Sequence, residues 1–345
     1  MPTAEPPRRV TVFALGGTIA MGATAETGGA ALSLSAEQLL AAVPGSADTG
    51  VGVDVVDFRR VPSAALRVSD ISALAAAIRD RARDTDGVVV IQGTDTIEET
   101  AYLLDLLHAG VEPIVVTGAM RNPTLAGADG PANILAAIHT AAHPDARGQG
   151  CLVVFNDEIH AARRVRKTHT ISTATFRSPN GGPLGYLVEG VPRFLNRLAH
   201  RTVVPADPGD DIRVALVPIV LGDDGTTVRA VADHVDGLVI AGLGGGHVPP
   251  PLVEDLEALA ARIPVVLASR TAAGSVLRST YEFAGSERDL LARGLVCAGY
   301  LDALKARILL HTLLTARCDS SVIRTAFEVA GATAAPGTWP WTTGG

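Results

Sequence analysis

Two threonines and an aspartate stand where the sequence predicts that buried strands end. Thr94 and Asp95 follow the apolar run at 88–92 and a glycine, and Thr18 follows the apolar run at 10–15 and two glycines. In open α/β sheets, ligands bind at the carboxyl ends of the strands, in front of helix N-termini. Hydroxyl and carboxylate groups at such corners are therefore candidates for nucleophilic and proton-transfer chemistry.

The same residue types also begin helices. Thr94, Asp95 and Thr96 are each suited to cap the helical pattern that follows, and Glu98 and Glu99 stand where a capping box needs them. The sequence around Thr94 therefore predicts both a helix start and a candidate site.

The N-terminal part of the chain alternates apolar runs with helical periodicity. Strands are expected at 10–15, 51–58, 88–92, 114–117 and 151–155, and helices at 35–43, 69–83 (capped by Ser69 or Asp70), 96–108 and 130–142. This alternation is typical of a parallel sheet with right-handed crossovers. We expect its carboxyl edge to gather Thr18, Thr94, Asp95 and the segment near Ala119. The Gly-, Ala- and Thr-rich segment 21–31 predicts a mobile flap without a packed element.

A basic cluster lies farther along the chain, in a segment rich in Thr and Ser. It consists of Arg163, Arg164, Arg166 and Lys167. Such clusters are usually solvated faces.

The apolar pattern lapses at 201–212, which we interpret as a linker between a catalytic α/β domain at 1–200 and a smaller α/β domain at 213–345. In the second domain, strands are expected at 214–220, 238–241 and 265–268, and helices at 252–262 and from about 287 and 303. The C-terminal segment 334–345 is expected to form a tail that either packs against the protein or is disordered. The glycine-rich run at 242–247 is similar to a dinucleotide-binding fingerprint, but its last position is His247 and not glycine or alanine. We therefore do not expect it to bind a dinucleotide.

Composition excludes several classes of function. The chain has 345 residues and a net charge of −7, which argues against a nucleic-acid or anionic-membrane partner. The sequence contains no P-loop, nucleophile elbow, His-Glu-x-x-His or Cys-x-x-Cys motif, so we expect neither a metal nor a cofactor. Three separated cysteines, and an N-terminus without a signal-like apolar region, predict a cytoplasmic protein without disulfides.

Taken together, the motifs resemble those of the bacterial-type L-asparaginase family. The matching segments are 14–20 (ALGGTIA), 92–101 (QGTDTIEETA), 116–121 (VTGAMR) with 129–133 (DGPAN), and 167–170 (KTHT) with 176–180 (FRSPN) and 182–185 (GPLG). The resemblance implies hydrolysis of L-asparagine to L-aspartate and ammonia. It also implies a homotetramer of intimate dimers whose sites are shared between subunits.

The resemblance also implies roles for individual residues. Thr18 would attack the substrate amide and form an acyl-enzyme, and the polar chain Thr94, Asp95 and Lys167 would move protons and keep Asp95 ionised. Substrate contacts are implied for Ser63, Gly93, Ala119, His247, Tyr281 and Glu282.

Two departures from the family pattern bear on these roles. The flap lacks the tyrosine that secreted relatives carry, so Thr18 is expected to be activated by another group, or by Tyr281 or Glu282 of a neighbouring subunit. Ala64 and Ala65 replace polar residues beside Ser63. We therefore expect weaker substrate binding and low glutaminase activity.

Two alternatives stay open at this point. One is an amidase for another substrate, such as a subunit that supplies ammonia to a second reaction. The other is an inactive homologue that binds an acidic amino acid.

Overall fold

The structure is a computed structural model that describes residues 7–16, 21–23, 30–32, 36–41, 43–45, 49–271 and 273–341. Thr18 and residues 24–29 of the predicted flap lie outside these ranges. The chain divides into two compact units, Met1–Arg201 and Thr202–Gly345.

The first unit is built on an eight-stranded sheet with the order β12-β11-β8-β7-β6-β5-β1-β4. Its strands are β1 (Arg9–Ala14), β4 (Gly52–Asp57), β5 (Gly87–Ile91), β6 (Ile114–Thr117), β7 (Cys151–Phe155), β8 (Glu158–Ala161), β11 (Gly185–Val188) and β12 (Val191–Phe194). The pairs from β7 to β4 are parallel, and those from β7 to β12 are antiparallel. The prediction of a mainly parallel sheet is thus confirmed.

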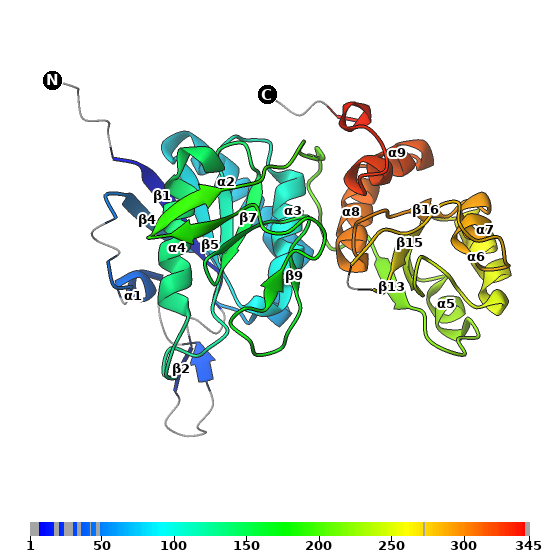
Figure 1. Cartoon of the computed structure of the whole chain (residues 1–345), viewed down its shortest axis with the longest axis horizontal. Helices are drawn as coiled ribbons and strands as arrows, with labels where there is room; N and C mark the ends of the chain where they lie inside the picture. Colours follow the sequence, from blue (N-terminus) through cyan, green and yellow to red (C-terminus); the bar gives the residue numbers. More distant parts are fainter. Residues whose placement is uncertain are drawn as a thin grey trace. The chain divides into compact units, whose positions relative to one another are not determined.

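Helices cover both faces of this sheet (Figure 1). They are α1 (Ala36–Ala41), α2 (Val68–Arg81), α3 (Ile97–Leu107) and α4 (Gly130–Ala142), with short 3₁₀ turns η3 (Ser63–Ala65), η4 (Ala82–Asp84), η5 (Thr94–Thr96) and η6 (Pro144–Ala146). β5, β6 and β7 are neighbours in that order, so the connections β5–α3–β6 and β6–α4–β7 advance in the same direction. Crossovers of one hand would place α3 and α4 on the same face.

Instead, α4 packs on the face formed by Val89, Val115 and Leu152, and α3 covers the other face (Figure 1). The two crossovers therefore have opposite hands, and the prediction of uniformly right-handed crossovers is wrong. The segment 118–129 between β6 and α4 is long enough to carry the chain to the other face. A connection of this length does not impose the right-handed crossover that a short strand–helix loop favours.

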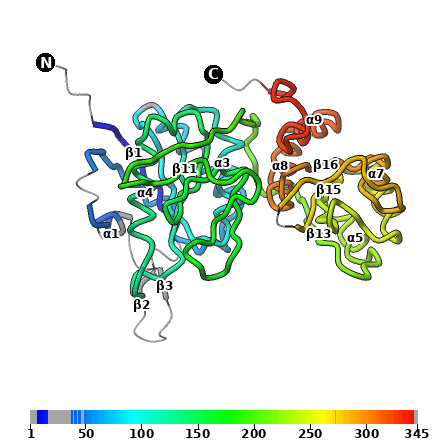
Figure 2. Tube along the Cα trace, in the orientation of Figure 1, coloured from blue at the N-terminus to red at the C-terminus, as the bar shows by residue number. Residues whose placement is uncertain are grey.

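Two local predictions also need correction. α2 begins at Val68 rather than after Ser69 or Asp70, because the carboxylate of Asp70 accepts the backbone N–H of Arg67 at 3.1 Å and supports the first turn from its third position. In the predicted flap, β2 (Met21–Ala23) and β3 (Ala30–Leu32) form an antiparallel pair, side by side in the trace of Figure 2. Backbone pairing between strands does not require large side chains, so the low hydrophobicity of this segment was a poor guide.

The second unit contains a four-stranded parallel sheet in the order β13-β14-β15-β16. Its elements are β13 (Val214–Pro218), α5 (Thr226–Val231), β14 (Gly237–Gly242), η7 (Pro250–Leu252), α6 (Val253–Ala260), β15 (Val265–Ser269), α7 (Glu287–Ala292), β16 (Val296–Cys297), α8 (Ala303–Thr315), α9 (Ser320–Ala330) and η8 (Pro336–Thr338). Near the C-terminus, the indole N–H of Trp339 donates to the carbonyl of Val203 at 2.9 Å, so the predicted tail is packed at this residue. Within the described ranges, every helix is too short or too polar to span a bilayer.

Candidate active site

Thr94 lies at the carboxyl end of β5, where the sequence predicted a strand–helix corner. β5 is buried along its whole length, and the 3₁₀ turn η5 connects it to α3. The predicted capping box is not formed, because Thr96 makes no side-chain cap bond. The carboxylate of Glu98 instead accepts the backbone N–H of Lys167 at 3.4 Å.

Four predicted site residues lie together at this corner. The ammonium of Lys167 donates to the hydroxyl of Thr94 at 2.9 Å and forms an ion pair with Oδ1 of Asp95 at 3.4 Å. The hydroxyl of Ser63 donates to Oδ2 of Asp95 at 2.9 Å and accepts the backbone N–H of Asp95 at 3.3 Å. Gly93 is the N-terminal boundary residue of the turn that holds them.

Burial differs within this group in a way that bears on chemistry. Thr94 and Ser63 are buried, with exposed fractions of 6% and 3%, whereas the side chain of Asp95 is 63% exposed. Lys167 is intermediate at 17%. One carboxylate therefore faces solvent while its hydroxyl and ammonium partners lie behind it, an arrangement suited to binding a cationic group of a ligand.

Lys167 reaches Thr94 on a small sheet of its own. β9 (Arg166–Lys167) pairs with β10 (Phe176–Arg177) and with no other strand in the described ranges. The ring of Phe176 packs on that of Phe155 with centroids 4.8 Å apart, and the hydroxyl of Ser178 lies 2.9 Å from Nδ1 of the buried His160. The four basic residues of this region are half-buried, so the prediction of a solvated basic cluster is wrong.

Ala119 lies at the same edge, after β6, and is 1% exposed. Asp129 and Asn133, at the start of α4, bind the backbone on either side of Ala119. Both residues belong to the motif at 129–133, but the motif did not indicate a role for either of them. Their signal was the spacing of four on a helix, which places both side chains on one face.

β1 ends at this edge as well. Ala14 is in register with Ile91 of β5, and the chain continues to Gly16, which has a positive φ of 101°. Glycine adopts this conformation without strain. Thr18, the predicted nucleophile, lies outside the described residues.

In the second unit, His247 is the centre of a separate cluster. Its Nε2 lies 3.2 Å from Oε2 of Glu287, and its ring packs edge-on against Tyr281 and Phe283 with centroid distances of 5.0 and 5.1 Å. Glu282, predicted to contact substrate, pairs with Arg288.

Glu287, which sequence reasoning missed, is a fully buried carboxylate. It accepts the backbone N–H groups of Thr280 at 2.8 Å and Tyr281 at 3.0 Å. Burial alone would raise the pKa of Glu287, but these donors and His247 outweigh burial, so its pKa is lowered. The charged carboxylate therefore fixes both His247 and the backbone that carries Tyr281.

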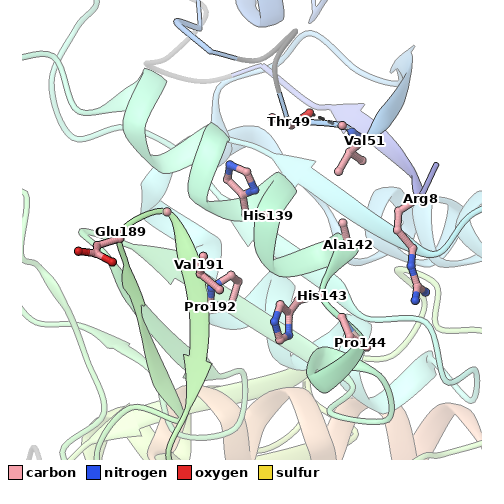
Figure 3. A pocket seen from close by; sticks show the side chains of 12 residues that line it. Arg8, Thr49, Val51, His139, Ala142, His143, Pro144, Glu189, Val191 and Pro192 are labelled. Carbon is pink, nitrogen blue, oxygen red and sulfur yellow. Dashed lines mark hydrogen bonds between the residues drawn. The ribbon is translucent and has the colours of Figure 1, made fainter. Parts of the chain in front are cut away.

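A cleft of about 560 Å³ lies at the opposite, amino edge of the large sheet (Figure 3). Its walls include Arg8, Val51, His139, His143 and Val191, and none of the residues grouped around Thr94. Burial lowers the pKa values of both His139 and His143. In the part of the chain that the structure describes, no three His, Cys, Asp or Glu side chains gather closely enough to hold a metal ion.

Comparison with known proteins identifies the family. Residues 9–200 match the family model "Asparaginase, N-terminal", and residues 213–327 match "Glutaminase/Asparaginase C-terminal domain". The L-asparaginase of Bacillus licheniformis is 36% identical over 315 residues, which cover 89% of this chain and 95% of that protein. L-asparaginase 2 of Escherichia coli is 36% identical over 330 residues, with 92% of each chain covered.

Two further proteins match this chain over most of its length. The glutaminase-asparaginase of Pseudomonas fluorescens biotype A is 34% identical over 332 residues, which cover 92% of this chain and 89% of that protein. The crystal structure of the probable cytoplasmic L-asparaginase from Campylobacter jejuni has a TM-score of 0.82 and 32% identity, covering 93% of this chain and 99% of that chain. The chain therefore belongs to the asparaginase family of hydrolases.

Proposed function

We propose that this protein hydrolyses L-asparagine to L-aspartate and ammonia. The observation that carries the proposal is the contact of Lys167 with both Thr94 and Asp95 at the carboxyl edge of the sheet. Amide hydrolysis needs a nucleophile, a route for its proton and donors for the oxyanion. The names of the relatives, L-asparaginase and glutaminase-asparaginase, give the substrate class.

In the proposed mechanism, the hydroxyl oxygen of Thr18 bonds to the side-chain amide carbon, and the C–N bond breaks to release ammonia with a transferred proton. A water molecule then attacks the ester, breaks its C–O bond and restores the Thr18 hydroxyl. This role of Thr18 rests on its motif. Water is the only co-reactant.

Thr94 and Lys167 are assigned to proton movement. Because the hydroxyl oxygen of Thr94 accepts a bond from the Lys167 ammonium, the hydroxyl proton is directed to another acceptor. The nearby positive charge also stabilises negative charge that develops on the Thr94 oxygen. Backbone N–H groups near Gly93 and Thr94 are assigned to the oxyanion.

The substrate head group is assigned to Asp95 and Ser63. The exposed carboxylate of Asp95 is available to an ammonium group. Ser63 donates to Asp95 in this structure, so a bond from Ser63 to the substrate carboxylate requires its hydroxyl to rotate away from Asp95. Ala64 and Ala65, which follow Ser63 in η3, offer no polar side chain to the head group.

We further propose low activity on L-glutamine. One additional methylene changes discrimination by about 1 to 3 kcal/mol, which corresponds to a kcat/KM ratio of roughly 10 to 200. Steady-state kinetics on both amides give this ratio. Equal kcat/KM values would contradict the proposal.

The assembly and location are also proposals. We propose a homo-oligomer, a dimer of intimate dimers, in which Tyr281 or Glu282 of a neighbouring subunit helps to activate Thr18. Light scattering would give its mass. We propose a cytoplasmic location, as in the name of the Campylobacter jejuni neighbour, whereas a Haemophilus influenzae relative at 34% identity is named a probable periplasmic L-asparaginase. Cell fractionation distinguishes the two.

The central experiment measures ammonia release from a panel of amides by the wild type, Thr18→Ala and Thr18→Ser. Asparagine should be the best substrate, and Thr18→Ala should lower kcat by at least about 10³-fold, since loss of a nucleophile removes the covalent route. Thr18→Ser keeps a hydroxyl and should retain measurable turnover. A better substrate elsewhere in the panel would favour another amidase. Stabilisation by aspartate without any turnover would favour an inactive amino-acid-binding homologue.

A further inference from the structure

The turn that follows β6 has its backbone bound from two sides by the first turn of α4. The side-chain amide of Asn133 donates to the carbonyl of Gly118 at 3.0 Å. The two carboxylate oxygens of Asp129 accept the N–H groups of Met120 at 3.0 Å and Arg121 at 2.9 Å. These bonds fix the peptide groups before and after Ala119.

Asn133 connects this turn to the rest of the sheet edge. It is 3% exposed, its amide also donates to Oδ2 of Asp129 at 3.2 Å, and its side-chain oxygen accepts the N–H of Asn156 at 3.0 Å. Asn156 follows β7 and has a positive φ of 49°. One buried amide therefore holds the ends of two neighbouring strands at a fixed separation.

Ala119 itself is the exception in this network. Within the described part of the chain, neither its N–H nor its carbonyl makes a hydrogen bond, although the residue is 1% exposed. Buried peptide groups are almost always paired. The bonds on both sides hold the peptide groups of Ala119 at the edge where Thr94 lies.

We infer that Asp129 and Asn133 are positioning residues that hold the Ala119 carbonyl to accept an N–H of the substrate amide. This inference rests on the proposed function. A primary amide presents an N–H to such an acceptor, whereas an ester of the same acid has no N–H to donate. A displacement of about 1 Å at a substrate-positioning contact lowers the rate by roughly 10²-fold.

The test compares L-asparagine with the β-methyl ester of L-aspartate. Asp129→Asn replaces one acceptor oxygen by an NH₂ group, which opposes one of the two backbone N–H groups. This variant should lower kcat/KM for asparagine by about 10- to 100-fold and for the ester by less than about 3-fold, because only the amide uses the Ala119 carbonyl as an acceptor. The matched control is Asp319→Asn, since the carboxylate of Asp319 also accepts two successive N–H groups, at 2.9 and 3.0 Å, in the other unit. The control should change neither value.

A second variant, Asn133→Ala, keeps the carboxylate of Asp129 and releases Gly118. It should change the amide-to-ester ratio in the same direction, and it gives a second measurement if Asp129→Asn does not fold. Equal losses for both substrates, or no loss for either, in folded variants would overturn the inference. If the wild type hydrolyses neither substrate, the proposed function fails and the inference fails with it.

Discussion

The two edges of the large sheet differ in what they gather. The carboxyl edge holds Thr94, Asp95 and Lys167 in mutual contact, whereas the amino edge holds the cleft with His139 and His143 (Figure 3). Helices of a parallel sheet begin at the first edge, where backbone N–H groups favour negative charge, and end at the second, where carbonyl groups favour positive charge. The cleft therefore lies at the edge that is less suited to amide hydrolysis, because an oxyanion is stabilised where N–H groups point.

Among the described residues at the carboxyl edge, the most damaging change should be Lys167→Met. Removing a positioned proton-transfer group lowers kcat by about 10²- to 10⁴-fold. Steady-state ammonia release measures the effect. Arg164→Met removes a half-buried cation from the same basic segment and is the control. If both variants lost activity equally, the contacts of Lys167 with Thr94 and Asp95 would not explain the loss.

The buried His160, on β8 of the same sheet, should make the stability of the protein depend on pH. Burial and the nearby charge of Arg177 lower the pKa of His160 to about 4, and the adjacent Glu158 carboxylate is paired with Arg177. Between pH 4 and 6.5 the unfolded chain binds more protons at this residue than the folded chain, so the free energy of unfolding is highest above pH 6.5 and decreases as the pH falls towards 4. The total contribution is about 3 kcal/mol.

Chemical denaturation of the wild type and of His160→Gln at several pH values measures this contribution. The difference in free energy of unfolding between the two proteins should shrink or reverse as the pH falls. A difference that stays constant from pH 7 to pH 4 would contradict the assignment.

A smaller effect is expected for Ser63→Ala. The variant loses the hydroxyl that fixes the carboxylate of Asp95, and a hydrogen bond to a charged group contributes about 1.5 to 3 kcal/mol. The Michaelis constant for asparagine should rise roughly 10-fold or more while kcat changes less. Ser321→Ala removes a comparable bond to Asp319 in the other unit and should leave both constants unchanged. A fall in kcat alone would place Ser63 in the chemical step instead.

The smallest effect is expected at the amino edge. His139→Ala and His143→Ala should leave kcat/KM within about 2-fold of the wild type, because surface substitutions away from a site have small energetic effects. Kinetics on asparagine provide the measurement. A loss of 10-fold or more in either variant would show that the cleft takes part in activity and would break the contrast between the edges.

Much of this organisation was predictable from sequence, because buried strands and glycine corners leave local signals. The mainly parallel sheet, the smaller second unit and the family are confirmed. The hand of the β6–α4–β7 crossover was not predictable, since a local pattern does not tell on which face a helix packs.

The residues of the site were likewise not connected by any local pattern. Thr94 and Lys167 are 73 positions apart, and only the resemblance connected them before the structure brought them together. The roles inferred for Asp129, Asn133 and Glu287 lie in bonds to the backbone of other segments. The spacing of Asp129 and Asn133 indicates a shared helix face, but a sequence does not tell which backbone groups a side chain binds, so these roles could not be assigned from it.

The segment 118–129 has a consequence for how this enzyme can diversify. Surface loops usually tolerate insertions and deletions. Here the length of the segment 118–129 allows α4 to reach its face of the sheet and also positions Ala119. Shortening the segment would therefore disturb both the path of the chain and the position of the Ala119 carbonyl. New substrate preferences should therefore arise in this stretch by replacing residues, and not by changing their number.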